Sequence, residues 1–120
     1  MELKADAQLL RIFLGESDKL QHTSLHEAIV REARRRELAG ATAWRGIMGF
    51  GHTSRIRTSK ILDLSTDLPI IVEIADTKEN IAGFLPTLQK MFEEAGCGGL
   101  ITIEQVRVIH YPHARPEECP

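Results

Sequence analysis

The first patterned segment of the chain is Gln8–Gly15, which is largely apolar. Leu10, Ile12 and Leu14 would point to one side of an extended segment, and further apolar side chains between them would point to the other. A period of two residues is that of a β-strand, because successive side chains lie on opposite faces. We therefore predict a first strand here that is apolar on both faces.

Three further segments have the composition of strands. Residues 41–50 are largely apolar, residues 68–75 are rich in β-branched side chains, and residues 100–111 form a strand whose alternation slips near Glu104 and Gln105. Pro69 has no N–H to donate to a sheet, so it is expected at the start of its strand or at a sheet edge. A short continuation of the second strand is predicted at residues 61–64.

Two segments repeat their apolar positions with the period of an amphipathic helix. The first begins at Ser24–Glu27, a capping-box sequence, and Gly40 is its candidate left-handed residue at the C-terminal end. The second has Thr77 as its candidate N-cap and runs to Ala95. Pro86 should kink this helix or mark the start of its regular part.

The predicted order is β-α-β-β-α-β, which favours an α+β, ferredoxin-like domain over residues 8–111. Its four strands form an antiparallel sheet with both helices on one face, and residues 1–7 and 112–120 are loose tails. The helix-free face would carry large apolar side chains from the first and third strands, more than a soluble monomer usually exposes. We therefore predict that this face is buried between subunits of a closed, cyclic oligomer.

Charge and composition narrow the classes of function. The net charge is −2, so no global positive field attracts nucleic acid. No apolar run is long enough to span a bilayer, and the first residues, MELKADA, do not read as a secretory signal. Two cysteines, Cys97 and Cys119, do not form a disulfide framework. These features favour a cytoplasmic protein.

The segment from Gly46 to Lys60 is the most informative part of the chain about a possible ligand. Closely spaced glycines are followed by three cations and four hydroxyl side chains without any acid. Glycines let backbone N–H groups approach a ligand, and Arg and Lys supply donors that suit phosphate oxygens. The alternative is a solvated surface loop between two strands.

Several segments together resemble PII signalling proteins. They are the Gly49-Phe50-Gly51 sequence that ends the second strand, the long loop after it, the turn Gly96-Cys97-Gly98-Gly99, and the stretches LRIFLGESDK, HEAIVREAR, GATAWRGIMGFG and LPIIVEIADT. The similarity covers about residues 8–111 and is closest to the PII-like branch catalogued as a conserved domain of unknown function.

The resemblance implies a trimer whose sheets face inward. In PII proteins, small molecules, notably adenine nucleotides, bind in clefts between neighbouring subunits. The long loop after the second strand changes conformation and engages a target, such as a membrane transporter or an enzyme. By position, Gly49 and Gly51 would let the backbone approach the ligand, and Gly98 and Gly99 would form the phosphate-facing turn.

At the positions that match PII proteins, this sequence has fewer positively charged residues than that family has. His52 stands where a cation follows the glycines in that family, and Leu100 stands where a lysine follows the turn. Arg55, Arg57 and Lys60 remain as candidate contacts to a ligand or a partner protein. A nucleoside monophosphate or diphosphate, or another anionic metabolite, is therefore expected over a triphosphate, as an effector and not as a cofactor.

A structural or metal-responsive trimer of the divalent-cation-tolerance type is the alternative function. It would use histidines or cysteines and not the glycine turns. His22 with His26, and His110 with His113, are only pairs, whereas a zinc site needs three or four ligands. We therefore assign no metal site.

No pattern of a catalytic nucleophile occurs, so no enzyme and no catalytic residue is predicted. An enzyme would need a titrating pair in the cleft between subunits, and His52 is the side chain of the glycine segment that titrates near neutrality. Trp44 is expected as a buried or interface anchor more than as a base-stacking residue. Arg45 is expected in an ion pair between subunits more than on a ligand, and Cys97 has no obvious resolving thiol.

Overall fold

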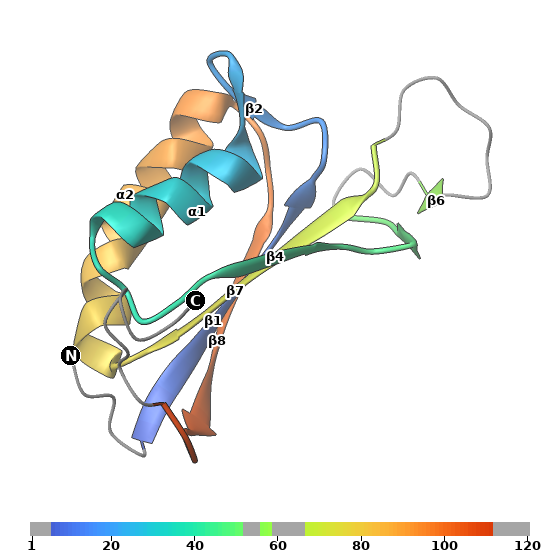
Figure 1. Cartoon of the computed structure of the whole chain (residues 1–120). Helices are drawn as coiled ribbons and strands as arrows, with labels where there is room; N and C mark the ends of the chain where they lie inside the picture. The colour runs from blue at the N-terminus through green and yellow to red at the C-terminus, as the bar shows by residue number, and fades with distance from the viewer. Residues whose placement is uncertain (1–5, 52–55, 59–66, 112–120) are drawn as a thin grey trace, which may run out of the picture.

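The computed structural model describes residues 6–51, 56–58 and 67–111. It contains one four-stranded antiparallel sheet, with both helices packed against the same face (Figure 1). In spatial order, its strands are β4 (Thr42–Arg45), β7 (Pro69–Asp76), β1 (Asp6–Gly15) and β8 (Leu100–Arg107). The helices are α1 (Leu25–Arg35) and α2 (Lys78–Ala95). The predicted ferredoxin-like α+β fold is thus confirmed.

Two small hairpins lie outside this sheet. The first pairs β2 (Lys19–Leu20) with β3 (Thr23–Ser24), between β1 and α1. The second pairs β5 (Met48–Gly49) with β6 (Arg57–Thr58). The prediction of one strand over residues 41–50 is therefore wrong, because its two halves pair with different partners. The predicted continuation at 61–64 lies outside the described residues.

The core lies between the sheet and the two helices. Leu10 and Ile12 of β1 are fully buried against Val72 and Ile74 of β7 and against the apolar stripes of the helices. The helical stripes consist of Leu25, Ile29 and Ala33 in α1 and of Ile81, Phe84, Leu88 and Phe92 in α2. These positions repeat every three or four residues, so each helix turns one continuous side to the sheet.

The helix ends follow the sequence signals only in part. Thr77 caps α2, since its hydroxyl accepts from the N–H of Asn80 at 3.1 Å, and α2 continues through Pro86. Ser24 occupies the N-cap position of α1, but its side chain makes no capping hydrogen bond. Gly40 does not end α1: the helix ends at Arg35, and Glu37 is the residue with a positive φ of 60°.

The strand boundaries also shift. β1 begins two residues before the predicted Gln8, so Ala7, which we placed in the N-terminal tail, is a buried residue of the sheet. Pro69 is the first residue of β7, as predicted, and β8 ends at Arg107. Residues 1–5 and 112–120 of the predicted tails lie outside the described ranges. None of the described helices is both long enough and apolar enough to cross a lipid bilayer.

Candidate functional site

One end of the sheet gathers several of the predicted glycines. β1 pairs with both β7 and β8, and this pairing brings the end of β1 next to Pro69 and next to Leu100. Gly46 joins the same end, because its N–H donates to the carbonyl oxygen of Pro69 at 2.7 Å. We call this end, formed by residues 13–15, 46–49, 69 and 99–100, the glycine edge.

Close packing explains two of these glycines within the single chain. A Cβ atom on Gly49 would stand 3.2 Å from the Cγ atom of Pro69. A Cβ atom on Gly99 would lie 2.6 Å from the ring of Phe92 and 2.8 Å from the carbonyl oxygen of Phe13. Larger residues therefore cannot enter at Gly99 without displacing backbone, whatever its role toward a ligand.

The structure describes only some of the other residues predicted for the ligand site. Gly51 has open space where a side chain would stand, and Gly98 is exposed just before β8. Arg57 belongs to β6, where its backbone pairs with Gly49. His52, Arg55 and Lys60 lie outside the described residues. The assignment of these residues to a ligand site therefore stays a prediction.

Exposed apolar side chains surround the β5–β6 hairpin, which the sequence analysis did not anticipate. Ile47 is 78% exposed and Phe50 is 70% exposed, and Met48 and Ile56 are also exposed. Figure 1 places β6 beyond the end of the main sheet, away from both helices. Such a surface is typical of a contact with another protein. The signal was the apolar segment Ile47–Phe50, which we had interpreted only as part of a strand.

The helix-free face of the sheet has a polar centre. Arg11 donates from Nε to Oε2 of Glu73 at 3.0 Å, and its Nη1 lies 3.0 Å from Oε1 of Glu104. The indole Nε1 of Trp44 donates to Oε1 of Glu73, also at 3.0 Å. Trp44 is therefore a half-exposed residue that helps to hold Glu73 in place. We call these four residues the Arg11 cluster.

Apolar side chains flank the Arg11 cluster on both sides. By pairing, Phe13, Ile71 and Leu100 lie toward the glycine edge, and Leu9 and Ala75 lie toward the other end. Ile71 is almost fully buried, Phe13 and Leu9 are half-buried, and Leu100 is 58% exposed. The predicted apolar character of this face is thus present, but it is interrupted by an ion-pair network.

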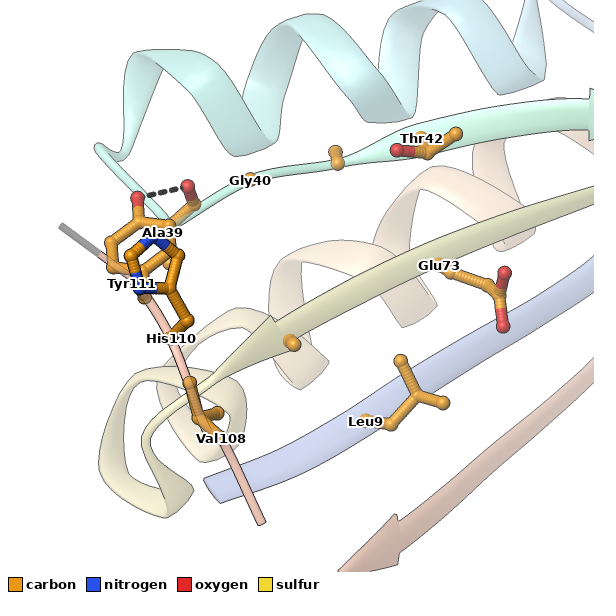
Figure 2. A pocket seen from close by; sticks show the side chains of 10 residues that line it. Leu9, Ala39, Gly40, Thr42, Glu73, Val108, His110 and Tyr111 are labelled. Atoms are coloured by element: carbon orange, nitrogen blue, oxygen red, sulfur yellow. Dashed lines mark hydrogen bonds between the residues drawn. The ribbon is translucent and has the colours of Figure 1, made fainter. Parts of the chain in front are cut away.

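A pocket of about 440 Å³ opens at the end of the helix-free face that is opposite to the glycine edge. Its walls are Leu9, Ala39, Gly40, Ala41, Thr42, Glu73, Ala75, Val108, His110 and Tyr111. Figure 2 shows Leu9 and Glu73 on neighbouring strands, with His110 and Tyr111 closing the far side. The hydroxyl of Tyr111 donates to the carbonyl oxygen of Ala39 and so fixes one wall. This sheet-face pocket does not coincide with the site predicted from the sequence.

Three alternatives from the sequence can be compared with the structure. Arg45 forms an ion pair with Glu16 of the same chain, so it does not need a neighbouring subunit for a partner. Burial, together with the nearby Asp18 carboxylate, raises the pKa of the Cys97 thiol, which lowers its reactivity. Within the described ranges, no three His, Cys, Asp or Glu side chains converge into a possible metal site.

Comparison with known proteins identifies the family. The family model DUF190, described as "Uncharacterized ACR", matches residues 7–108. A UPF0166 protein of Aquifex aeolicus is 38% identical over 103 residues, which are 86% of this chain and 93% of that protein. A UPF0166 protein of Methanocaldococcus jannaschii is 35% identical over 102 residues, which are 85% of this chain and 91% of that protein.

Comparison with solved structures of other proteins identifies the fold. The structure of CPII, a nitrogen regulatory PII-like protein from Thiomonas intermedia K12 bound to ADP, AMP and bicarbonate, aligns with a TM-score of 0.65 at 20% identity. The alignment covers 86% of this chain and 88% of CPII. A second CPII structure, bound to ADP and bicarbonate, aligns with a TM-score of 0.63. At this identity the likeness shows the fold alone. The chain therefore belongs to the DUF190 family, and its fold is that of the PII-like proteins.

Proposed function

We propose that this protein is a PII-like regulator that binds an adenine nucleotide between the subunits of a trimer. The observation that carries the proposal is the glycine edge, where Gly49 lies against Pro69 and Gly99 against Phe13 at the same end of the sheet, although the two glycines are far apart in sequence. The fold likeness to CPII, which binds ADP and AMP, supports the choice of ligand.

The single chain supplies only one wall of the proposed nucleotide site. The glycine edge offers a surface where backbone is close to the exterior, but the described pocket lies elsewhere on the sheet. A second subunit would supply the opposite wall, so the trimer and the site form together. The apolar flanks of the helix-free face are the surface that this assembly would bury.

The 51–60 loop would transmit the bound state to a target protein, for example a membrane transporter. It begins just after Gly49 and Phe50 and contains β6 and the exposed Ile56. A nucleotide changes the conformation of the loop only as far as it binds one conformation more tightly than another. This role is regulatory, and the proposal includes no catalytic residue.

Calorimetric titration with AMP, ADP and ATP, each with and without bicarbonate, tests the proposal. Gly51→Ala is the informative variant, because an added Cβ meets no atom within 4 Å in the part of the protein that the structure describes, so it would obstruct a ligand or a second subunit. Gly83→Ala on α2 is the matched control, since its Cβ also meets open space. We expect the parent protein to bind ADP. Gly51→Ala should weaken this binding about tenfold or more, and Gly83→Ala should leave it unchanged. Absence of binding by every nucleotide at millimolar concentration contradicts the proposal.

A further inference from the structure

We propose that a second pocket, beneath α1, binds an organic carboxylate that has an apolar body. The walls of this pocket come from two adjacent parts of the chain. They are Val30, Ala33 and Arg34 of α1, and residues 38–41, which lead from α1 toward β4. Figure 1 shows this segment leaving the end of α1 and running back below the helix into β4. We call this cavity the α1 pocket.

The α1 pocket lies on the side of the sheet that the helices cover. The proposed trimer would bury the opposite, helix-free face, so the wall that α1 supplies stays outside that contact. Residues 39–41 also line the sheet-face pocket, so this short segment lies between the two cavities. The α1 pocket shares no residue with the glycine edge, and it does not rest on the nucleotide proposal.

The size and lining of the α1 pocket suit a small organic molecule. Its volume is about 320 Å³, near the lower end of the range of ligand pockets, about 300 to 1,000 Å³. Val30 and Leu38 are half-buried and Ala33 is almost fully buried, so they present apolar surface to the cavity. An aromatic ring or a short alkyl chain would be the part of the ligand that packs here.

Arg34 supplies the charge of the α1 pocket. It is the one charged side chain among the described residues that line the cavity. The arginines on either side of it already hold carboxylates of α1, since Arg31 pairs with Glu27 and Arg35 pairs with Glu32. Within the described part of the chain, Arg34 has no such partner. Its guanidinium can therefore receive an anion from outside.

A carboxylate fits this arrangement better than a phosphate does. The planar guanidinium of Arg34 can donate two parallel hydrogen bonds to the two oxygens of one carboxylate. Its single positive charge balances one carboxylate, whereas a phosphate monoester carries about two negative charges at neutral pH. The other walls of the pocket supply apolar surface and no second cation to balance the excess.

The segment that forms the second wall is held in place before any ligand arrives. The N–H of Leu38 donates to the carbonyl oxygen of Ala33 at 3.1 Å, and the N–H of Ala39 donates to Oδ2 of Asp76 at 2.7 Å. The hydroxyl of Tyr111 donates to the carbonyl oxygen of Ala39. Because these bonds fix the segment, ligand binding requires little further ordering of the backbone.

The probe for this site is phenylacetate, and phenylacetamide is its neutral control of nearly the same shape. Each is titrated into the isotopically labelled full-length protein, and the amide N–H resonances of Gly40 and Ala41, which line the pocket, report binding. We expect phenylacetate to shift both resonances saturably at millimolar concentration. Phenylacetamide should bind about tenfold or more weakly, because it brings no charge to Arg34.

Two variants and a matched control locate the probe. Arg34→Gln removes the charge of the pocket, so it should weaken phenylacetate binding about tenfold and leave phenylacetamide binding unchanged. Val30→Phe fills the cavity without a change in charge, and it should abolish both shifts. Arg31→Gln removes the same charge from α1 outside the pocket lining and should leave binding unchanged. Arg34 is exposed, so Arg34→Gln decides the test even if Val30→Phe unfolds the protein.

Three outcomes overturn the proposal. Equal binding of phenylacetate and phenylacetamide shows a merely apolar cavity. Equal weakening by Arg34→Gln and Arg31→Gln shows only a diffuse attraction of anions to α1. Resonances of Gly40 and Ala41 that do not shift at millimolar concentration show that the carboxylate does not enter the α1 pocket. Because ADP titrations are separate measurements, none of these results bears on the glycine edge.

Discussion

The backbone N–H of Ala39 donates to Oδ2 of Asp76 at 2.7 Å, which joins the segment after α1 to the start of α2. Asp76 is fully buried, and its Oδ1 accepts from the N–H of Thr77 and from the side chain of Asn80. One carboxylate thus satisfies donors from two separate parts of the chain. The same contact positions Ala39, which lines the sheet-face pocket.

Replacement of Asp76 by alanine should strongly destabilise the fold. The change leaves the part-buried N–H of Ala39 without its acceptor and removes the contacts at the start of α2, so we expect a loss of about 2–4 kcal/mol. Urea unfolding measures the difference. Glu93→Ala on the exposed side of α2 is the control and should change stability by less than about 0.5 kcal/mol. Near-equal stability of the two variants contradicts this account.

Gly99→Ala should destabilise the protein even without any ligand. The added Cβ would stand 2.8 Å from the carbonyl oxygen of Phe13, which is backbone of the central strand β1 and cannot move aside easily. Overpacking of this kind typically costs about 1–3 kcal/mol. Thermal unfolding of the apo protein tests it.

Gly83→Ala should act in the opposite direction. Gly83 lies inside α2, and a Cβ there meets nothing within 4 Å. Alanine is favoured over glycine in a helix by about 0.5–1 kcal/mol, so this variant should be more stable than the parent protein. If Gly99→Ala unfolds at the same temperature as Gly83→Ala, the packing described at the glycine edge is incorrect.

The fold was predictable because its signals are local. The alternation over residues 8–15, the β-branched segment that begins near Pro69 and the helical spacing around Phe84 each define an element without knowledge of the others. The N-cap at Thr77 was found for the same reason. Gly40 misled the prediction of the C-terminal end of α1, since Glu37 adopts the left-handed conformation at lower frequency than glycine does.

The candidate sites were less predictable because they depend on pairing. Only the contacts across the sheet show that Arg11 faces both Glu73, which is 62 positions away, and Glu104, which is farther still along the chain. The sheet-face pocket likewise joins residues near 9, 40, 75 and 110. The sequence did suggest that glycines near 49 and 99 act together, but through a resemblance and not through their spacing.

Acidification should remove one surface contribution to stability. Arg35 and Arg36 hold the pKa of Glu32 at about 2, below its usual value of 4.5, through hydrogen bonds of 2.5–2.9 Å. Because the pKa is lower in the folded state, the contribution is full above about pH 4.5 and is lost as the pH falls through about 2. Solvent screens the ion pair through the exposed side chain of Arg35, so Glu32→Gln should cost about 0.5–1 kcal/mol at neutral pH.

Paired unfolding measurements test the contribution of Glu32. The difference between the parent protein and Glu32→Gln should be largest at neutral pH and should shrink toward zero near pH 2. It should also shrink in high salt. A difference that stays constant down to pH 2 would show that the carboxylate charge has no part in it. Glu94→Gln, an exposed change on α2, controls for nonspecific charge effects.

Phe13→Lys should dissociate the proposed trimer while it preserves the fold of the protomer. Phe13 is half-buried on the helix-free face between Ile71 and Leu100, so a lysine there can reach water in a single chain. In an assembly that buries this face, its charge would lose water without gaining a partner, which is costly. Sedimentation should show three protomers for the parent protein and one for the variant, at equal helix content by circular dichroism. Gln89→Lys, an exposed change on α2, should remain trimeric. A parent protein that sediments as a single protomer contradicts both the buried face and the nucleotide site between subunits.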